Sequence, residues 1–141
     1  MEHIAYCESK ANELDNLVNG YKSMLIRGAA GRKLPHGRVA IGDIVYLINN
    51  DSTGKILAKG IVNFVYHSEK LTRDESERII DENMHRLKLT TDQRKRWIGK
   101  RFLCLVEIEN VVTVEPFSYV REKNMDDWII VEKVQDIMRS K

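Results

Sequence analysis

The sequence predicts an α+β domain built on a mixed β-barrel of about six strands, with a helix near the N-terminus and a central helical insertion. Short apolar runs bounded by turn residues recur along the chain, and two capping-box motifs mark helices in its middle. The sequence has no βαβ repeat, the pattern that would predict a parallel, doubly wound sheet. With 141 residues, the chain is expected to form a single domain, 1–141, that buries a core without disulfides.

The first third of the chain predicts a strand, a helix and a second strand. His3 to Cys7 is an apolar start, and the segment from Glu8 to Gly20 has apolar residues at helical spacing and ends in Asn-Gly, a common helix stop. Lys22 to Arg27 is expected to be extended. The glycines and the proline between residues 28 and 38 then exclude a regular element, so this segment is expected to be a loop.

The middle of the chain predicts a hairpin. Ile44 to Ile48 and Ile56 to Tyr66 have strand character, and Asn49 to Gly54 between them is a strong turn signal. Gly60 interrupts the second strand, which indicates a bulge or a sharp bend.

The helical insertion follows this hairpin. Thr72 with Glu75, and Thr90 with Gln93, have the spacing of capping boxes, and each precedes apolar residues at helical spacing. After the insertion, three strands are expected at 102–108, 111–114 and 128–131, with a bend or bulge at Glu109-Asn110 between the first two.

Composition places the chain among ordinary soluble proteins, with 43% hydrophobic and 31% charged residues. The apolar runs are too short to span a membrane, and the first residues lack the features of a signal peptide, so a cytoplasmic location is expected. Cys7 and Cys104 lie far apart in strand-like segments and are expected to be reduced thiols in the core. No metal-ligand spacing occurs, and we expect no metal and no cofactor.

The net charge is only +2, but the charges are segregated along the chain. Residues 20–38 and 94–101 carry basic side chains without any Asp or Glu, whereas acids concentrate at 69–82 and 107–127. Such segregation predicts one basic face on the folded molecule. Trp97 lies inside the second basic run, where it could stack on a base or pack in the core.

The first basic segment contains Gly20-Tyr-Lys-Ser-Met-Leu-Ile-Arg27, which resembles the G-x-K-x-x-x-x-R signature of the ASCH superfamily, domains of the PUA-like β-barrel type. Gly42-Asp43-Ile-Val-Tyr resembles a strand opening of the same superfamily, and the order of elements is similar from about Ile4 to Val131. The resemblance implies that Lys22 and Arg27 line a cleft between barrel and helices, and that its ligand is RNA or a nucleotide.

Residue chemistry agrees with such a ligand, because a glycine-rich turn exposes backbone N–H groups while Lys and Arg supply charge and forked donors. A strictly alternating strand would place Lys22 and Arg27 on opposite faces, so both reach one cleft only if the strand twists or bulges. The partner is expected to be RNA or a nucleotide, with no membrane, and the protein to be a monomer or small homo-oligomer. The predicted ligand-binding residues are Gly20, Tyr21, Lys22, Ser23, Arg27, Gly28, Arg32, Lys33, Arg38 and Tyr66.

Two alternatives to RNA binding stay open, a hydrolase and a protein-interaction domain. Some small ASCH-like proteins hydrolyse N4-acylated cytidine, and their catalytic set resembles Lys22 and Glu82, with Leu25 here occupying the position of a threonine and Ser23 the nearest hydroxyl. Others hydrolyse RNA, which a basic cleft would also suit. An interaction domain for an acidic protein is the remaining possibility. If the cleft binds RNA, Lys22→Ala and Arg27→Ala are expected to weaken RNA binding without lowering the melting temperature.

Overall fold

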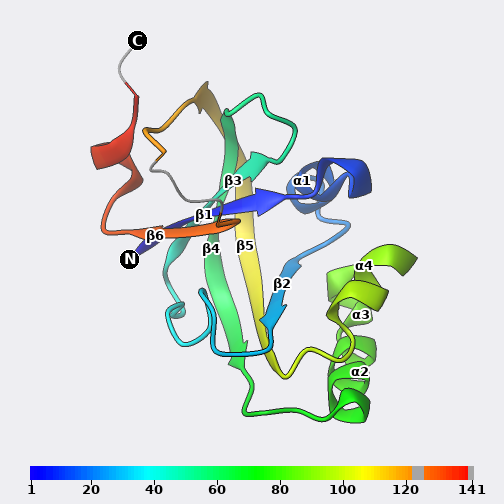
Figure 1. The fold of residues 1–141 in the computed structure, drawn as a ribbon. Helices are drawn as coiled ribbons and strands as arrows, with labels where there is room; N and C mark the ends of the chain where they lie inside the picture. Colours follow the sequence, from blue (N-terminus) through cyan, green and yellow to red (C-terminus); the bar gives the residue numbers. More distant parts are fainter. Residues whose placement is uncertain (122–125, 140–141) are drawn as a thin grey trace.

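The computed structural model describes residues 1–121 and 126–139, and its centre is one mixed sheet (Figure 1). Six strands form it in the order β2-β5-β4-β3-β1-β6. In chain order they are β1 (Glu2–Cys7), β2 (Met24–Ala29), β3 (Ile44–Asn49), β4 (Ile56–His67), β5 (Phe102–Phe117) and β6 (Trp128–Val131). The sheet curls into a half-barrel, which confirms the predicted PUA-like α+β architecture.

The strand pairing explains why the sheet is mixed. β1 runs parallel to β3, whereas the four other neighbouring pairs are antiparallel. β2 and β6 are the two edges of the sheet. Because β1 and β3 are parallel, the end of β1 lies next to the end of β3. The segments that follow these two strands therefore lie at the same end of the half-barrel.

Bulges bend the two longest strands. In β4 the register shifts around Gly60, where a Cβ atom would stand 3.1 Å from Val111 and 3.3 Å from the backbone of Glu109, so the predicted bulge is confirmed. Asn110 adopts a left-handed conformation with φ of 52°. The expected bend at Glu109-Asn110 therefore lies inside one continuous 16-residue strand, β5, and does not separate two strands.

The helices are α1 (Glu13–Val18), α2 (Arg73–Glu82), α3 (Met84–Leu87) and α4 (Thr91–Trp97), with 3₁₀ turns at Ser9–Ala11 and Val134–Ile137. Both predicted capping boxes are present, because the Thr72 and Thr90 hydroxyls accept the N–H groups of Glu75 and Gln93 and those two side chains accept the threonine N–H groups. In the described ranges, none of these helices has the length and apolar character that crossing a membrane demands.

Side-chain alternation along β2 divides the core into two layers. Leu25 points into the barrel with Cys104 and Val106, and Ile26 points to the opposite face, where it packs with Ile80 and other residues of the helical insertion. Helices α2, α3 and α4 are thereby held against the outer face of β2 and β5 (Figure 1). Cys7 and Cys104 are buried free thiols, as predicted, and burial raises the pKa of Cys104 to about 12.

Candidate functional site

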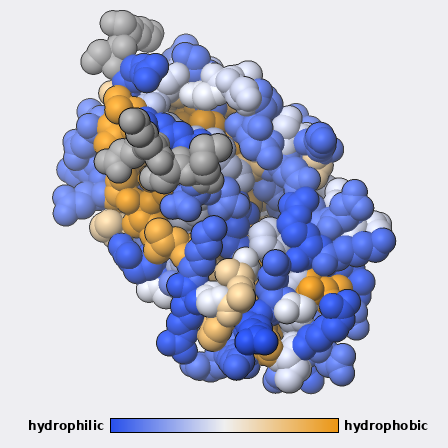
Figure 2. Space-filling model, viewed as in Figure 1, coloured by the Kyte–Doolittle hydropathy of each residue, from blue (hydrophilic) through white to orange (hydrophobic). Residues whose placement is uncertain are grey.

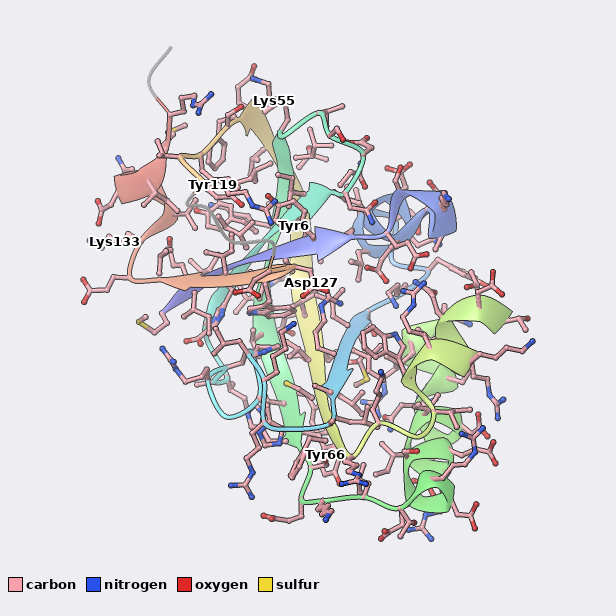
Figure 3. All side chains as sticks on the ribbon, viewed as in Figure 1. Tyr6, Lys55, Tyr66, Tyr119, Asp127 and Lys133 are labelled. Atoms are coloured by element: carbon pink, nitrogen blue, oxygen red, sulfur yellow. The ribbon has the colours of Figure 1, made fainter. Side chains whose placement is uncertain are left out.

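A cleft of about 580 Å³ opens between the edge of the sheet, α1, α4 and the segments on either side of residues 122–125. Three aromatic side chains line it, from β1, from α4 and from the chain after β5. Tyr6 and Tyr119 lie close together beside Asp127 (Figure 3). The lining of the cleft also includes Trp97 and the side-chain amides of Asn49, Asn50 and Gln93. The volume of the cleft is typical of sites for small organic ligands.

Arg27 is fixed in the wall of this cleft by its neighbours. Its guanidinium donates hydrogen bonds to the backbone oxygens of Ile26 at 2.9 Å and Tyr6 at 2.7 Å, and its Nε lies 3.1 Å from the Asp127 carboxylate. The guanidinium carbon lies 5.4 Å from the centre of the Trp128 ring. Arg27 thus ties β2 to β1 and β6, and its side chain is 10% exposed.

A pair of tyrosines forms a second part of the wall. The hydroxyls of Tyr6 and Tyr119 are 2.5 Å apart, and the Arg121 guanidinium lies 4.5 Å from the Tyr6 ring centre. The backbone N–H of Tyr6 also donates to the backbone oxygen of Asp127 at 2.9 Å. Burial, and then the bond to Tyr6, raise the pKa of Tyr119, so its hydroxyl is a neutral donor and acceptor at physiological pH.

Helix α4 supplies the opposite wall through Gln93 and Arg96. The Gln93 amide donates to Glu8 at 3.0 Å and approaches Glu13 at 3.5 Å, and Arg96 forms a two-pronged contact with Glu8 at 2.9 and 3.3 Å. The hydrogen bond from Arg96 is the main cause that lowers the pKa of Glu8. The Thr90 capping box fixes the turn of α4 that carries Gln93.

Lys22 lies behind Glu13, which itself lines the cleft. The Lys22 ammonium is 3.5 Å from the Glu13 carboxylate and donates to the backbone oxygen of Leu87, and its side chain is almost completely buried. Burial lowers the pKa of Lys22, and Glu13 opposes part of this shift. Lys22 precedes β2, so the alternation of the strand does not govern its direction, and it influences the cleft through Glu13.

The charges of the cleft are balanced. Arg27, Arg96 and Arg121 face Glu8, Glu13, Asp126 and Asp127 in its lining, and several of these groups contact one another directly. Such a lining offers hydrogen-bond donors, acceptors and aromatic surface in place of a strong positive field. The sequence predicted a basic cleft, whereas this lining carries both basic and acidic side chains.

Of the predicted site residues, Arg27 lines the cleft and Lys22 contacts its wall. Ser23 does neither, because its hydroxyl donates to Glu107 on β5 at 2.9 Å. Tyr21, next to Gly20, is exposed, with the Lys88 ammonium 4.8 Å from its ring centre. Leu25, at the position of the family's threonine, is fully buried in the barrel core.

The remaining predicted residues lie elsewhere. Gly28 packs against Leu103 and Lys100, and the exposed residues Arg32, Lys33 and Arg38 do not line this cleft. Tyr66 packs beside the helical insertion, far from Tyr6 and Tyr119 in Figure 3. Glu82 is exposed at the end of α2, so the carboxylate that Lys22 meets is Glu13.

Sequence reasoning missed most of the wall, including Glu8, Glu13 and Gln93. One signal for Glu13 was available: it precedes buried Leu17 by four residues, which puts a carboxylate on the apolar face of α1. Asn49 and Asn50 were assigned only to a turn, and Tyr119 was not among the predicted site residues. Within residues 1–121 and 126–139, His, Cys, Asp and Glu side chains form no cluster of three that could ligate a metal.

Comparison with known proteins gives similarity at the level of structure. No protein-family model and no curated protein matches the sequence. Three crystal structures of an ASCH protein from Zymomonas mobilis are similar to this chain. One mutant has a TM-score of 0.72 at 9% identity, over 96% of this chain and 91% of that one.

The unsubstituted protein has a TM-score of 0.63 and a second mutant 0.64, each at 10% identity over 83% of this chain and 73% and 75% of those chains, respectively. At such low identity the likeness concerns the arrangement of the backbone. The chain therefore has an ASCH-like fold of the PUA-like barrel type.

Proposed function

We propose that this cleft binds the nucleoside part of a nucleotide, either free or as one unit of an RNA. The observation that carries the proposal is the composition of its lining: three aromatic rings, three side-chain amides and the fixed guanidinium of Arg27 surround about 580 Å³. Bases in single strands are recognised by stacking on aromatic or guanidinium planes and by hydrogen bonds to their edges. Amides and balanced charges supply donors and acceptors of both kinds for such edges.

The balanced charge argues for the base and sugar as the part of the ligand inside the cleft. A polyphosphate would require more positive groups than carboxylates, and here Glu8, Glu13, Asp126 and Asp127 offset the arginines. The resemblance to ASCH domains supports the same class of ligand.

Calorimetric titration with the four ribonucleoside monophosphates tests this proposal. Trp97→Leu keeps an apolar side chain but removes the stacking surface, and should weaken binding by about tenfold or more, because stacking on an aromatic side chain contributes roughly 1–3 kcal/mol per base. Tyr21→Leu is the matched control, since Tyr21 is an exposed aromatic residue outside the cleft. The proposal fails if the wild type binds no nucleotide, or if both variants weaken binding equally.

A second candidate is hydrolysis of a modified nucleoside, as the resemblance implies for N4-acylated cytidine. The specific observation in its favour is the buried Lys22 beside Glu13, because a lysine of lowered pKa paired with a carboxylate is typical of acid–base chemistry. Incubation with N4-acetylcytidine and chromatography for released cytidine tests it. Release that Glu13→Gln abolishes would support the reaction, and absence of cytidine would reject it.

A further inference from the structure

The two acid-free segments of the sequence meet in space at one end of the sheet. Ala29 at the end of β2 pairs with Phe102 at the start of β5, and Gly28 pairs with Leu103 (Figure 1). A Cβ atom on Gly28 would stand 3.1 Å from the Cβ of Lys100. Residues 28–33 and 98–102, about 70 positions apart in the sequence, therefore form one surface.

A third segment, residues 69–75, completes this surface. The N–H of Leu71 donates to the oxygen of Arg101 at 2.7 Å, and the Arg73 guanidinium lies beside Gly99. We call this surface the basic end and define it by five exposed residues and one half-buried residue: Arg32, Lys33, Lys70, Arg73 and Arg101, with Lys100. In Figure 2 the lower part of the molecule is predominantly hydrophilic.

Few acids oppose these basic side chains. Glu75 is engaged in the capping box of α2, which leaves Glu69 and Asp74 as the other acids of the three segments. Glu69 contacts Arg32 at 3.3 Å, but its side chain is 91% exposed and that of Arg32 is 62% exposed. An ion pair of this kind contributes little to stability, so a phosphate can replace the carboxylate at small cost.

We propose that the basic end binds the phosphodiester backbone of a single-stranded nucleic acid. Six cationic side chains on three converging segments match a flexible chain of negative charges, and most of them reach solvent. The surface lies outside the cleft, and its charge excess is independent of what the cleft binds.

Flat groups next to these charges favour a nucleic acid over an acidic protein. The Arg32 guanidinium lies 5.4 Å from the centre of the Phe102 ring, and the His36 ring meets the same ring edge-on at 5.7 Å. His67 lies 5.2 Å from His36. Planar groups beside cations are the combination that single-stranded nucleic acids require, because bases stack while phosphates pair with charge.

The basic end also adjoins the cleft. Trp97 lines the cleft and Lys100 follows it by three residues, so their Cα atoms are at most about 11 Å apart. A strand with one nucleotide in the cleft can therefore place the phosphates of the flanking nucleotides, which a mononucleotide lacks, on Lys100 and Arg101. This continuity, unlike the charge of the surface, rests on the proposed function.

Fluorescence anisotropy with a labelled oligouridylate of about twelve nucleotides tests the proposal. The test variant is Lys70→Ser with Arg101→Ser, and the control is Lys55→Ser with Lys133→Ser, which removes the same charge from exposed positions remote from the basic end. Figure 3 shows Lys55 and Lys133 far from Tyr66, which precedes His67 at that end. Melting temperatures verify that all variants are folded.

The test variant should bind the oligonucleotide at least fivefold more weakly, and the slope of log K against log salt should fall by about 1.4, for two lost single-strand contacts at about 0.7 each. The control should retain both values. Equal losses in the two variants, or no loss in either, would overturn the proposal, and so would competition by poly-L-glutamate as strong as that by RNA.

Titration with mononucleotides separates this inference from the proposed function. Lys70→Ser with Arg101→Ser should leave mononucleotide affinity unchanged, whereas Trp97→Leu should reduce it. If the wild type binds no mononucleotide but the oligonucleotide still depends on Lys70 and Arg101, the cleft proposal fails and the basic end stands.

Discussion

The ammonium of Lys22 and the carboxylate of Glu13 are 3.5 Å apart, and both side chains are buried between α1 and the helical insertion. Lys22 also donates to the Leu87 oxygen, so one side chain holds α1, the approach to β2 and the end of α3 together. This burial changes the expectation for Lys22→Ala: its removal should cost stability as well as binding.

Lys22→Met should lower the free energy of unfolding by about 3 kcal/mol, because it leaves the Glu13 carboxylate buried without its counter-ion. The double variant Lys22→Met with Glu13→Leu should recover part of this loss, since neither charge then stays buried alone. Urea denaturation of the single and double variants measures both effects. Losses that simply add would show that the pair is not coupled, and Lys55→Met, at an exposed position, should change stability by less than about 0.5 kcal/mol.

Gly28→Ala should lower stability by about 1–3 kcal/mol, because the new Cβ atom would lie 2.8 Å from Leu103 Cδ2 and 3.1 Å from Lys100. Gly31→Ala, in the loop that follows β2, is the control. No atom lies within 4 Å of its Cβ position, so this substitution should be neutral or slightly stabilising. Thermal melting of the two variants distinguishes steric crowding at Gly28 from a general need for flexibility in the loop.

Thr90→Ala should lower stability by about 1 kcal/mol and weaken nucleotide binding. The Thr90 hydroxyl caps α4, and without it the first turn of the helix frays and no longer holds Gln93 in the cleft wall. The neighbouring substitution Thr91→Ala, at an exposed position inside the helix, should leave both quantities nearly unchanged. Equal effects of the two substitutions in melting and titration would contradict the capping role.

Acidification should destabilise the protein through His3. This side chain is fully buried, its Nδ1 accepts from Trp128 at 3.1 Å and its Nε2 lies 2.8 Å from Asp43, with the N-terminal amine and Arg38 also nearby. Burial lowers the pKa of His3 below its ordinary value of 6.5, despite the opposing effect of Asp43.

The unfolded chain therefore takes up this proton first, and the stability that the neutral ring contributes is lost as the pH falls below about 6.5. Urea denaturation at pH values on either side of 6.5 should show a smaller pH dependence for His3→Asn, whose amide oxygen can still accept from Trp128. The exposed residue His85 provides the control, and His85→Asn should behave like the wild type. An unchanged pH dependence in His3→Asn would exclude this role.

The local elements of the fold were largely predictable, because their signals lie in adjacent residues. The Thr72 and Thr90 boxes and the Gly60 bulge follow from short motifs, and the structure confirms all three. Asn110 was harder to interpret: a bend signal inside an apolar run is compatible with two strands or with one bulged strand. The long partner β4 decides in favour of one strand by pairing with β5 on both sides of the bulge.

The cleft was less predictable, because its walls come from segments that only the sheet topology brings together. Tyr6 and Tyr119 are 113 residues apart, and Gln93 reaches Glu8 across 85 residues. Arg27 was identified from its motif. The loop that follows β2 lies beside the start of β5, and its basic residues do not line the cleft. The sequence predicted that the two basic clusters give one face. It could not show that only part of each cluster, residues 28–33 and 98–102, meets at one end of the sheet.

The pairing of β1 with β6 has a consequence for how the chain folds. Ala5 pairs with Trp128, and His3 is bonded to the same indole, so contacts of very long sequence separation complete one side of the sheet. Closing so large a loop early carries a high entropic cost, whereas the β3–β4 hairpin can form locally. We therefore expect β6 to dock late, and the indole of Trp128 to report the final stage of refolding.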